Sequence, residues 1–113
     1  MAWKRVCAVE GLAANGLKKV SVDGLDVLVV NLGGEFRVIP PVCPHMEEPL
    51  VESGLYQDGV FTCTKHLWQW DMKTGTRTGE AERDIKLYQT RIEGGDLFAF
   101  IDKPLTYDYE EEE

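Results

Sequence analysis

The sequence KVSVDGLDVLVV spans residues 19–30 and decides the fold class. Residues 19–22 and 25–30 are rich in β-branched and aliphatic side chains, which favour extended strands. Asp23-Gly24 lies between these two runs, and a type I′ turn needs two central residues that tolerate a positive φ angle. This stretch therefore predicts an antiparallel β-hairpin.

Strand and turn signals alternate through the rest of the chain. Further turns are expected at Asn31-Leu32-Gly33-Gly34 before residues 36–39, at Asp58-Gly59 between 55–57 and 60–62, and at Gly94-Gly95-Asp96 between 86–93 and 97–101. The last of these strands carries apolar side chains on both faces, so both faces are expected to be covered. No segment keeps a helical period over three turns. The chain is therefore expected to form one all-β domain over residues 1–113, an antiparallel sandwich or barrel.

The composition excludes several classes of protein. The chain has 113 residues, with 20 acidic and 12 basic side chains and a net charge of −8, so it lacks the basic surface of a nucleic-acid-binding protein. No apolar run reaches the roughly 18–20 residues that cross a bilayer, and residues 1–7 do not resemble a secretory signal. Three cysteines do not suggest a disulfide framework. A cytoplasmic protein is expected, with no membrane or nucleic-acid partner.

The C-terminal end is strongly acidic. Residues 102–113 hold six acidic side chains and one lysine, and the chain ends in four glutamates. Like-charge runs at a terminus are usually solvated, so about residues 103–113 are expected to form a disordered tail. Docking of this tail on a basic partner is the alternative.

One loop interrupts the strand pattern. Residues 40–49 read PPVCPHMEEP, and four prolines in ten residues are incompatible with a central strand because proline has no N–H to donate. A stiff loop on a β scaffold is a typical place for function.

The two histidines of the chain both follow a cysteine closely. His45 lies two residues after Cys43, His66 lies three residues after Cys63, and 17 residues that include the Asp58-Gly59 turn separate the two pairs. Thiolate and imidazole ligands suit zinc or an iron–sulfur cluster. A structural zinc site would normally pair the cysteines with each other, and a catalytic dyad would leave the duplication unexplained. A mixed-ligand [2Fe–2S] cluster, with two thiolates on one iron and two imidazoles on the other, is the favoured interpretation.

The pattern Cys43-Pro44-His45, seventeen residues, Cys63-Thr64-Lys65-His66 resembles the Rieske motif C-x-H-x(15–17)-C-x-x-H. The resemblance covers the whole chain. It implies that Cys43 and Cys63 bind the inner iron, and that His45 and His66 bind the outer iron through Nδ1. It also implies a Rieske fold, in which an antiparallel base carries a small cluster-binding subdomain, here about residues 41–71.

Departures from the motif point to one branch of the family. High-potential Rieske proteins bridge their loops with two further cysteines, and the matching residues here are Glu48 and Lys65. Those proteins also direct hydroxyl groups at the cluster, where this chain has Trp68 and Trp70. Because hydrogen bonds to the sulfurs raise the potential, a value toward the low end of the Rieske range, about −150 mV, is expected. Cys7 is far from both loops and is expected to be a small buried hydrophobe.

The length leaves no room for a catalytic iron domain, so the resemblance implies a stand-alone electron carrier and not an enzyme. His66-Leu67-Trp68 is most similar to the ferredoxins of toluene-type diiron monooxygenases, which act on aromatic compounds or alkenes. The implied donor is an NADH-dependent flavin or iron–sulfur reductase, and the implied acceptor is the hydroxylase of the oxygenase. A monomer is expected. Dioxygenase ferredoxins and the small subunit of assimilatory nitrite reductase remain alternatives, as does a colourless zinc-stabilised binding module.

The surroundings of the cluster are also expected to contribute. An apolar collar around the imidazoles is expected from Met46, Pro49, Leu67 and Trp68, although core packing is equally open for Trp68. Trp70 is expected to pack in the core beneath the second loop. Residues 76–89 lack the proline that family members often place in a third loop, so the shielding of that side is left open.

Overall fold

The computed structural model describes residues 3–42, 49–65, 67–78, 84–101 and 105. It consists almost entirely of antiparallel strands, as expected. The elements in chain order are β1 Trp3–Ala8, the 3₁₀ turn η1 Val9–Gly11, β2 Leu17–Val22, β3 Leu25–Asn31, β4 Phe36–Ile39, α1 Leu50–Ser53, β5 Gly54–Gln57, β6 Val60–Cys63, β7 Trp68–Asp71, β8 Thr76–Thr78, β9 Gln89–Glu93 and β10 Asp96–Phe100.

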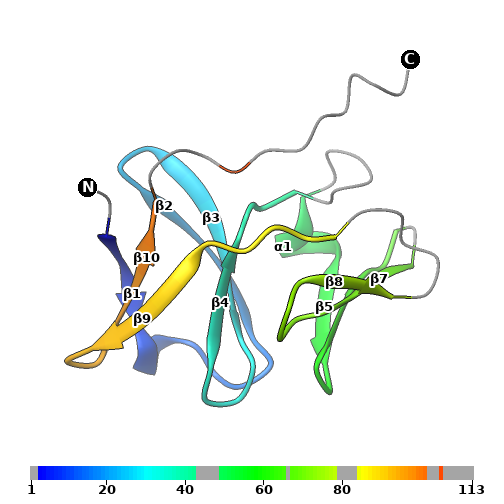
Figure 1. Ribbon diagram of the computed structural model, residues 1–113, viewed down its shortest axis with the longest axis horizontal. Coiled ribbons are helices and arrows are strands. Elements are labelled where there is room, and N and C mark those ends of the chain that lie inside the picture. Colours follow the sequence, from blue (N-terminus) through cyan, green and yellow to red (C-terminus); the bar gives the residue numbers. More distant parts are fainter. Residues whose placement is uncertain (1–2, 43–48, 66, 79–83, 102–104, 106–113) are drawn as a thin grey trace.

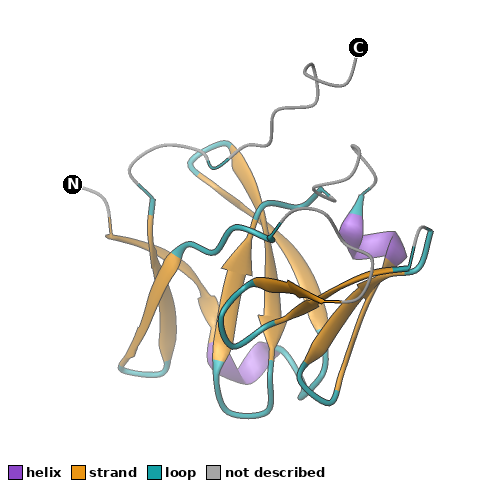
Figure 2. Cartoon of the chain, turned by 45° about the vertical axis from the view of Figure 1, so that its right-hand side comes forward, coloured by secondary structure: helices purple, strands orange, loops and turns teal. Residues whose placement is uncertain are grey.

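The strands form three sheets (Figure 1). Two of them, with strand orders β1-β10-β9 and β2-β3-β4, make up the base of the molecule. A β-bridge between Val38 and Tyr88 joins these two sheets at one edge. The third sheet, with the order β5-β6-β7-β8, lies beside the base, and α1 lies next to it (Figure 2). Among the described residues, no helix is long and apolar enough to cross a membrane.

The hairpin turns confirm the sequence expectation. Asp23-Gly24 has φ angles of 52° and 85°, and Asp58-Gly59 has φ angles of 54° and 86°, as a type I′ turn requires. The third hairpin turns at Gly94-Gly95, and Asp96 already belongs to β10. Its first strand begins at Gln89, later than the expected residue 86.

Strand β3 is buried on both faces and thereby connects two hydrophobic cores. Val27 and Val29 point between the two base sheets, whereas Leu28 and Val30 pack against the four-stranded sheet. All four side chains are inaccessible to solvent. The four-stranded sheet is therefore held against the outer face of the β2-β3-β4 sheet by apolar burial, the main favourable term in folding.

The expectation that both faces of the last strand are covered is wrong for β10. Leu97 and Ala99 are fully buried in the base, but on the other face Phe98 is half-buried and Phe100 is 36% exposed. The reason is that this face lies on the outside of the base, where the rings of Phe100 and Trp3 meet in an edge-to-face arrangement with 5.5 Å between their centroids.

Candidate functional site

The first predicted ligand loop has a well-defined neck. Val42 and Pro49 form an antiparallel bridge, and the N–H of Leu50 donates to the carbonyl of Pro41 at 2.8 Å. The two ends of the loop are therefore held side by side. Residues 43–48, with the predicted ligands Cys43 and His45 and the predicted collar residue Met46, lie outside the described residues.

The second predicted ligand pair begins at the end of a strand. Cys63 is the last residue of β6, is fully buried, and lies opposite Trp68 in β7. The N–H of Leu67 donates to the carbonyl of Cys63 at 2.7 Å, so the chain reverses between these two residues. His66 lies outside the described residues.

Ser53 joins the two loops. Its N–H donates to the carbonyl of Pro49 at 3.1 Å, and its carbonyl accepts from both the N–H and the Oγ1 of Thr64 at 2.8 Å each. One buried residue thus connects the neck of the first loop to the residue that directly follows Cys63. Sequence analysis missed this role, because the Ser53–Thr64 contact joins separate elements and has no local signature.

The indole rings beside Cys63 belong to the core. Trp68 is 8% exposed and meets Trp70, which is fully buried, in an edge-to-face arrangement with 6.3 Å between centroids. Trp68 therefore packs in the core, which is one of the two alternatives that the sequence left open. Trp70 lies in the core as expected. Of the remaining predicted collar residues, Pro49 and Leu67 are exposed, and Leu67 is 70% exposed with a φ angle of 63°.

A third segment packs against the four-stranded sheet where no proline was found. Ile85 is buried in the same core as Trp68, and its N–H donates to the carbonyl of Gly75 at 2.9 Å. Gly75 has a φ angle of 79°, and an added Cβ would lie 2.6 Å from the carbonyl oxygen of Ile85. The close approach of these two backbones thus requires glycine. An isolated isoleucine in a polar stretch gave little sequence signal for this contact.

Cys7 has no place in the site. It lies on β1 in the core of the base, as expected, and a bulge in the β1–β10 pairing allows both Val6 and Cys7 to face inward. Burial raises the pKa of the Cys7 thiol, against smaller opposing effects of Lys18 and Arg5. A buried neutral thiol is a packing group, in contrast to the thiolates that bind metals.

The fold and the site together define a small antiparallel β protein. A buried cysteine lies at the end of one strand, where hydrogen bonds join two loops. The Rieske [2Fe-2S] domain family matches residues 2–100, and the chain belongs to this family. Its cofactor is one [2Fe–2S] cluster.

The chain is similar to two curated ferredoxins over most of its length. It is 49% identical to the methanesulfonate monooxygenase ferredoxin subunit of Methylosulfonomonas methylovora, over 100% of this chain and 92% of that protein. It is 33% identical to the ferredoxin component of the alkene monooxygenase system of Xanthobacter autotrophicus, over 80% of this chain and 74% of that protein. The fold matches the ferredoxin of carbazole 1,9a-dioxygenase from Nocardioides aromaticivorans, with a TM-score of 0.77, 23% identity, and coverage of 88% of this chain and 98% of that one.

The described part of the site fits such a cluster. Cys63 supplies a thiol at a strand end in an apolar core, which excludes water from the inner side of a bound cluster. The Ser53 hydrogen bonds hold the two loops together, as a cluster with ligands from both loops requires. The described residues contain no group of three or more His, Cys, Asp or Glu side chains that could hold a metal ion, and the predicted ligands Cys43, His45 and His66 lie outside them.

Proposed function

We propose that this chain carries single electrons to the hydroxylase component of a monooxygenase system. The observation that carries the proposal is the 49% identity, over the full chain, to the ferredoxin subunit of a monooxygenase. A second monooxygenase ferredoxin is also similar. The protein is a carrier and not a catalyst: the relatives are named as ferredoxin components of oxygenase systems, and the chemistry of electron storage belongs to the cluster.

We assign the cluster ligands to Cys43, His45, Cys63 and His66. The two thiolates would hold one iron and the two imidazoles the other, and an added electron would then reside on the histidine-bound iron. The cluster-binding subdomain that we propose contains both loops and the sheet β5-β6-β7-β8. The chain's own residues exclude water through Trp68 and Trp70 and fix the distance between the loops through Ser53.

The docking surface that we propose lies beside the two loops. Pro49 and Leu67 expose apolar side chains there, and Leu67 is among the most exposed large hydrophobic residues of the described chain. Electron-carrier interfaces are small and short-lived, so a small apolar centre is sufficient. The donor that we propose is an NADH-dependent reductase in the cytoplasm, and the carrier acts as a monomer.

The test begins with the purified protein. We expect a red-brown sample with two irons per chain and, after dithionite reduction, the rhombic EPR signal of a mixed-ligand cluster. Cys63→Ser should lose this signal, and Cys7→Ala, which alters the cysteine in the base core, should keep it. A colourless, EPR-silent protein with one zinc ion would establish a zinc-stabilised module instead.

Reconstitution then identifies the acceptor. NADH oxidation coupled to substrate hydroxylation should depend on this chain when it is combined with its reductase and a monooxygenase hydroxylase. Turnover with a dioxygenase, and none with any monooxygenase, would contradict the proposed partner.

A further inference from the structure

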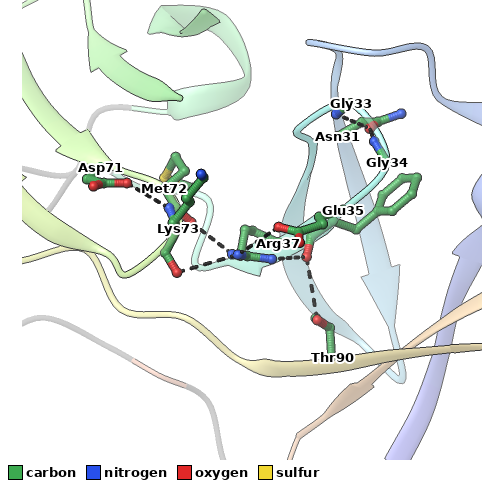
Figure 3. A network of polar contacts seen from close by, with 10 residues as sticks. Asn31, Gly33, Gly34, Glu35, Arg37, Asp71, Met72, Lys73 and Thr90 are labelled. Atoms are coloured by element: carbon green, nitrogen blue, oxygen red, sulfur yellow. Dashed lines mark hydrogen bonds and ion pairs between the residues drawn. The ribbon is translucent and has the colours of Figure 1, made fainter. Parts of the chain in front are cut away.

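Arg37 connects the base to the four-stranded sheet (Figure 3). It lies on β4, and its side chain is only 19% exposed. Its Nε donates to the carbonyl of Met72 at 2.8 Å, and its Nη2 lies 3.4 Å from the carbonyl of Lys73. These two carbonyls belong to the turn between β7 and β8, so a single guanidinium spans the two parts of the molecule.

The remaining donors of Arg37 hold the guanidinium in place. Nη1 donates to the carbonyl of Phe36 at 3.0 Å, and Nη2 pairs with Oε1 of Glu35 at 3.3 Å. The Phe36 carbonyl also lies 3.5 Å from Oγ1 of Thr90, which belongs to β9. Arginine suits this position because its planar fork presents several N–H donors in fixed directions.

The turn on the other side is also well held. The N–H of Met72 donates to the carbonyl of Gly59 at 3.0 Å, and the N–H of Lys73 donates to Oδ1 of Asp71 at 2.9 Å. The side chain of Met72 is fully buried in the core shared with the base. Arg37 therefore contacts a rigid turn, and a displacement of that turn would move the sheet as a whole.

The turn lies at the opposite end of β7 from the site. Trp68 begins β7 and is paired with Cys63, whereas Met72 directly follows its last residue. Four residues of strand span about 13 Å, so a small rotation at Met72 becomes a displacement at Cys63 and Leu67. The end of the sheet that Arg37 holds therefore determines the position of the end that carries Cys63 and Leu67.

We infer that Arg37 is a positioning residue for electron transfer: it fixes the four-stranded sheet on the base, and thereby the direction in which the cluster end faces a protein partner. The inference rests on the carrier function proposed above. Without the guanidinium, apolar burial still keeps the sheet on the base, but its tilt is less restricted, and a smaller fraction of the molecules presents the docking face correctly. The apparent affinity for a protein partner falls with that fraction.

The first readout is amide hydrogen exchange of the cluster-loaded protein. In Arg37→Met, we expect exchange across residues 54–78 to accelerate at least tenfold, with residues 17–31 unchanged. Arg37→Lys, which keeps the charge but loses the fork, should lie between this variant and the unsubstituted protein. Arg91→Met is the matched control, because this substitution makes the same change in net charge. Arg91 lies on β9 in the base, where its guanidinium stacks on the Trp3 ring at 4.4 Å from the centroid. Equal acceleration in both segments would mean a role in global stability only, and would overturn the inference.

The second readout is electron transfer from the dithionite-reduced protein to two oxidants. Cytochrome c requires an oriented encounter, whereas ferricyanide reacts from many directions. We expect the ratio of the cytochrome c rate to the ferricyanide rate to fall several-fold in Arg37→Met and to remain unchanged in Arg91→Met, with the EPR signal preserved. An unchanged ratio in Arg37→Met would also overturn the inference. Absence of the EPR signal from the unsubstituted protein would contradict the proposed function. Hydrogen exchange tests independently of that function whether Arg37 fixes the sheet.

Discussion

Thr64 donates two hydrogen bonds to one atom, the carbonyl oxygen of Ser53. The backbone N–H and Oγ1 each lie 2.8 Å from this oxygen. Because Ser53 also donates to the carbonyl of Pro49, the pair determines how far apart the two loops lie. The spacing of the predicted ligands thus depends on a contact between two residues that are not ligands.

Replacement of Thr64 by valine should loosen this connection. The variant keeps the shape and the backbone hydrogen bond but loses the one from Oγ1, which typically contributes about 1 kcal/mol to the free energy of unfolding. We expect that loss, together with faster release of iron to a chelator. Thr62→Val is the matched control, since Oγ1 of Thr62 accepts from Nε2 of Gln69 at 3.2 Å on the exposed face of the sheet. Equal iron release from both variants would contradict the role of the Ser53–Thr64 contact.

The left-handed conformation of Leu67 makes a second prediction. At a φ angle of 63°, a residue with a Cβ is disfavoured by about 1–2 kcal/mol. We expect Leu67→Gly to leave the unfolding free energy unchanged or raise it by about 1 kcal/mol, because glycine relieves the strain but loses more entropy on folding. Leu67→Val should lower it, since β-branched residues avoid this region. Thermal unfolding of both variants measures this difference, and an equal loss of stability in both would contradict strain at Leu67.

The same glycine variant separates stability from docking. Because Leu67 is exposed, its removal costs little burial but deletes an apolar contact of the proposed docking surface. We expect slower electron transfer to the hydroxylase without loss of stability. Leu55→Ala is the control, since Leu55 is 51% exposed on β5 and lies outside the proposed docking surface. A normal transfer rate in Leu67→Gly would remove Leu67 from the docking surface.

Much of the fold could be predicted because its signals are local. The Asp23-Gly24 and Asp58-Gly59 turns depend on the φ preferences of two adjacent residues, and both are confirmed. The burial of Cys7 follows from the general behaviour of free cysteine and is also confirmed. The family was recognised from the spacing of four residues, and the match over residues 2–100 confirms it.

The features that sequence analysis missed all depend on contacts between distant residues. Arg37 and Met72 are 35 positions apart, and no local pattern distinguishes this arginine from a surface one. A strand such as β10, with apolar residues at successive positions, has two apolar faces, but its sequence does not indicate whether a second layer covers each of them. For the same reason, Trp68 could be assigned to the core only once its neighbours were known. The assignment of Cys43, His45, Cys63 and His66 as ligands stays a prediction.

The Cys7 thiol should make the stability of the protein fall as the pH becomes alkaline. Burial raises the pKa of its thiol above the ordinary value of 9.0, so the folded state favours the protonated form. The stability that this preference supplies is complete below the ordinary pKa and is lost as the pH rises through the raised, folded-state value. In Cys7→Ala this part of the pH dependence should disappear, at the expense of a small cavity that lowers stability by about 1 kcal/mol at neutral pH.

Thermal unfolding of both proteins between neutral and strongly alkaline pH gives the measurement. The difference in stability between the unsubstituted protein and Cys7→Ala should narrow as the pH rises, because all other groups titrate in both. A constant difference would contradict a raised pKa at Cys7.

The contact between Gly75 and Ile85 makes the last prediction, which a second glycine controls. Gly75 and Gly59 both have positive φ angles, 79° and 86°, so alanine is disfavoured at each by about 1–2 kcal/mol. They differ in their surroundings: an added Cβ at Gly59 meets nothing within 4 Å, whereas at Gly75 it lies 2.6 Å from the carbonyl of Ile85. Gly75→Ala should therefore lower the free energy of unfolding by about 1–3 kcal/mol more than Gly59→Ala does, since backbone must move to make room.

The displaced segment carries Ile85 out of the core around Trp68, so faster oxidation of the reduced cluster by oxygen should accompany the loss of stability in Gly75→Ala alone. Equal costs in urea unfolding would mean that the segment around Ile85 yields freely and does not shield this side of the site.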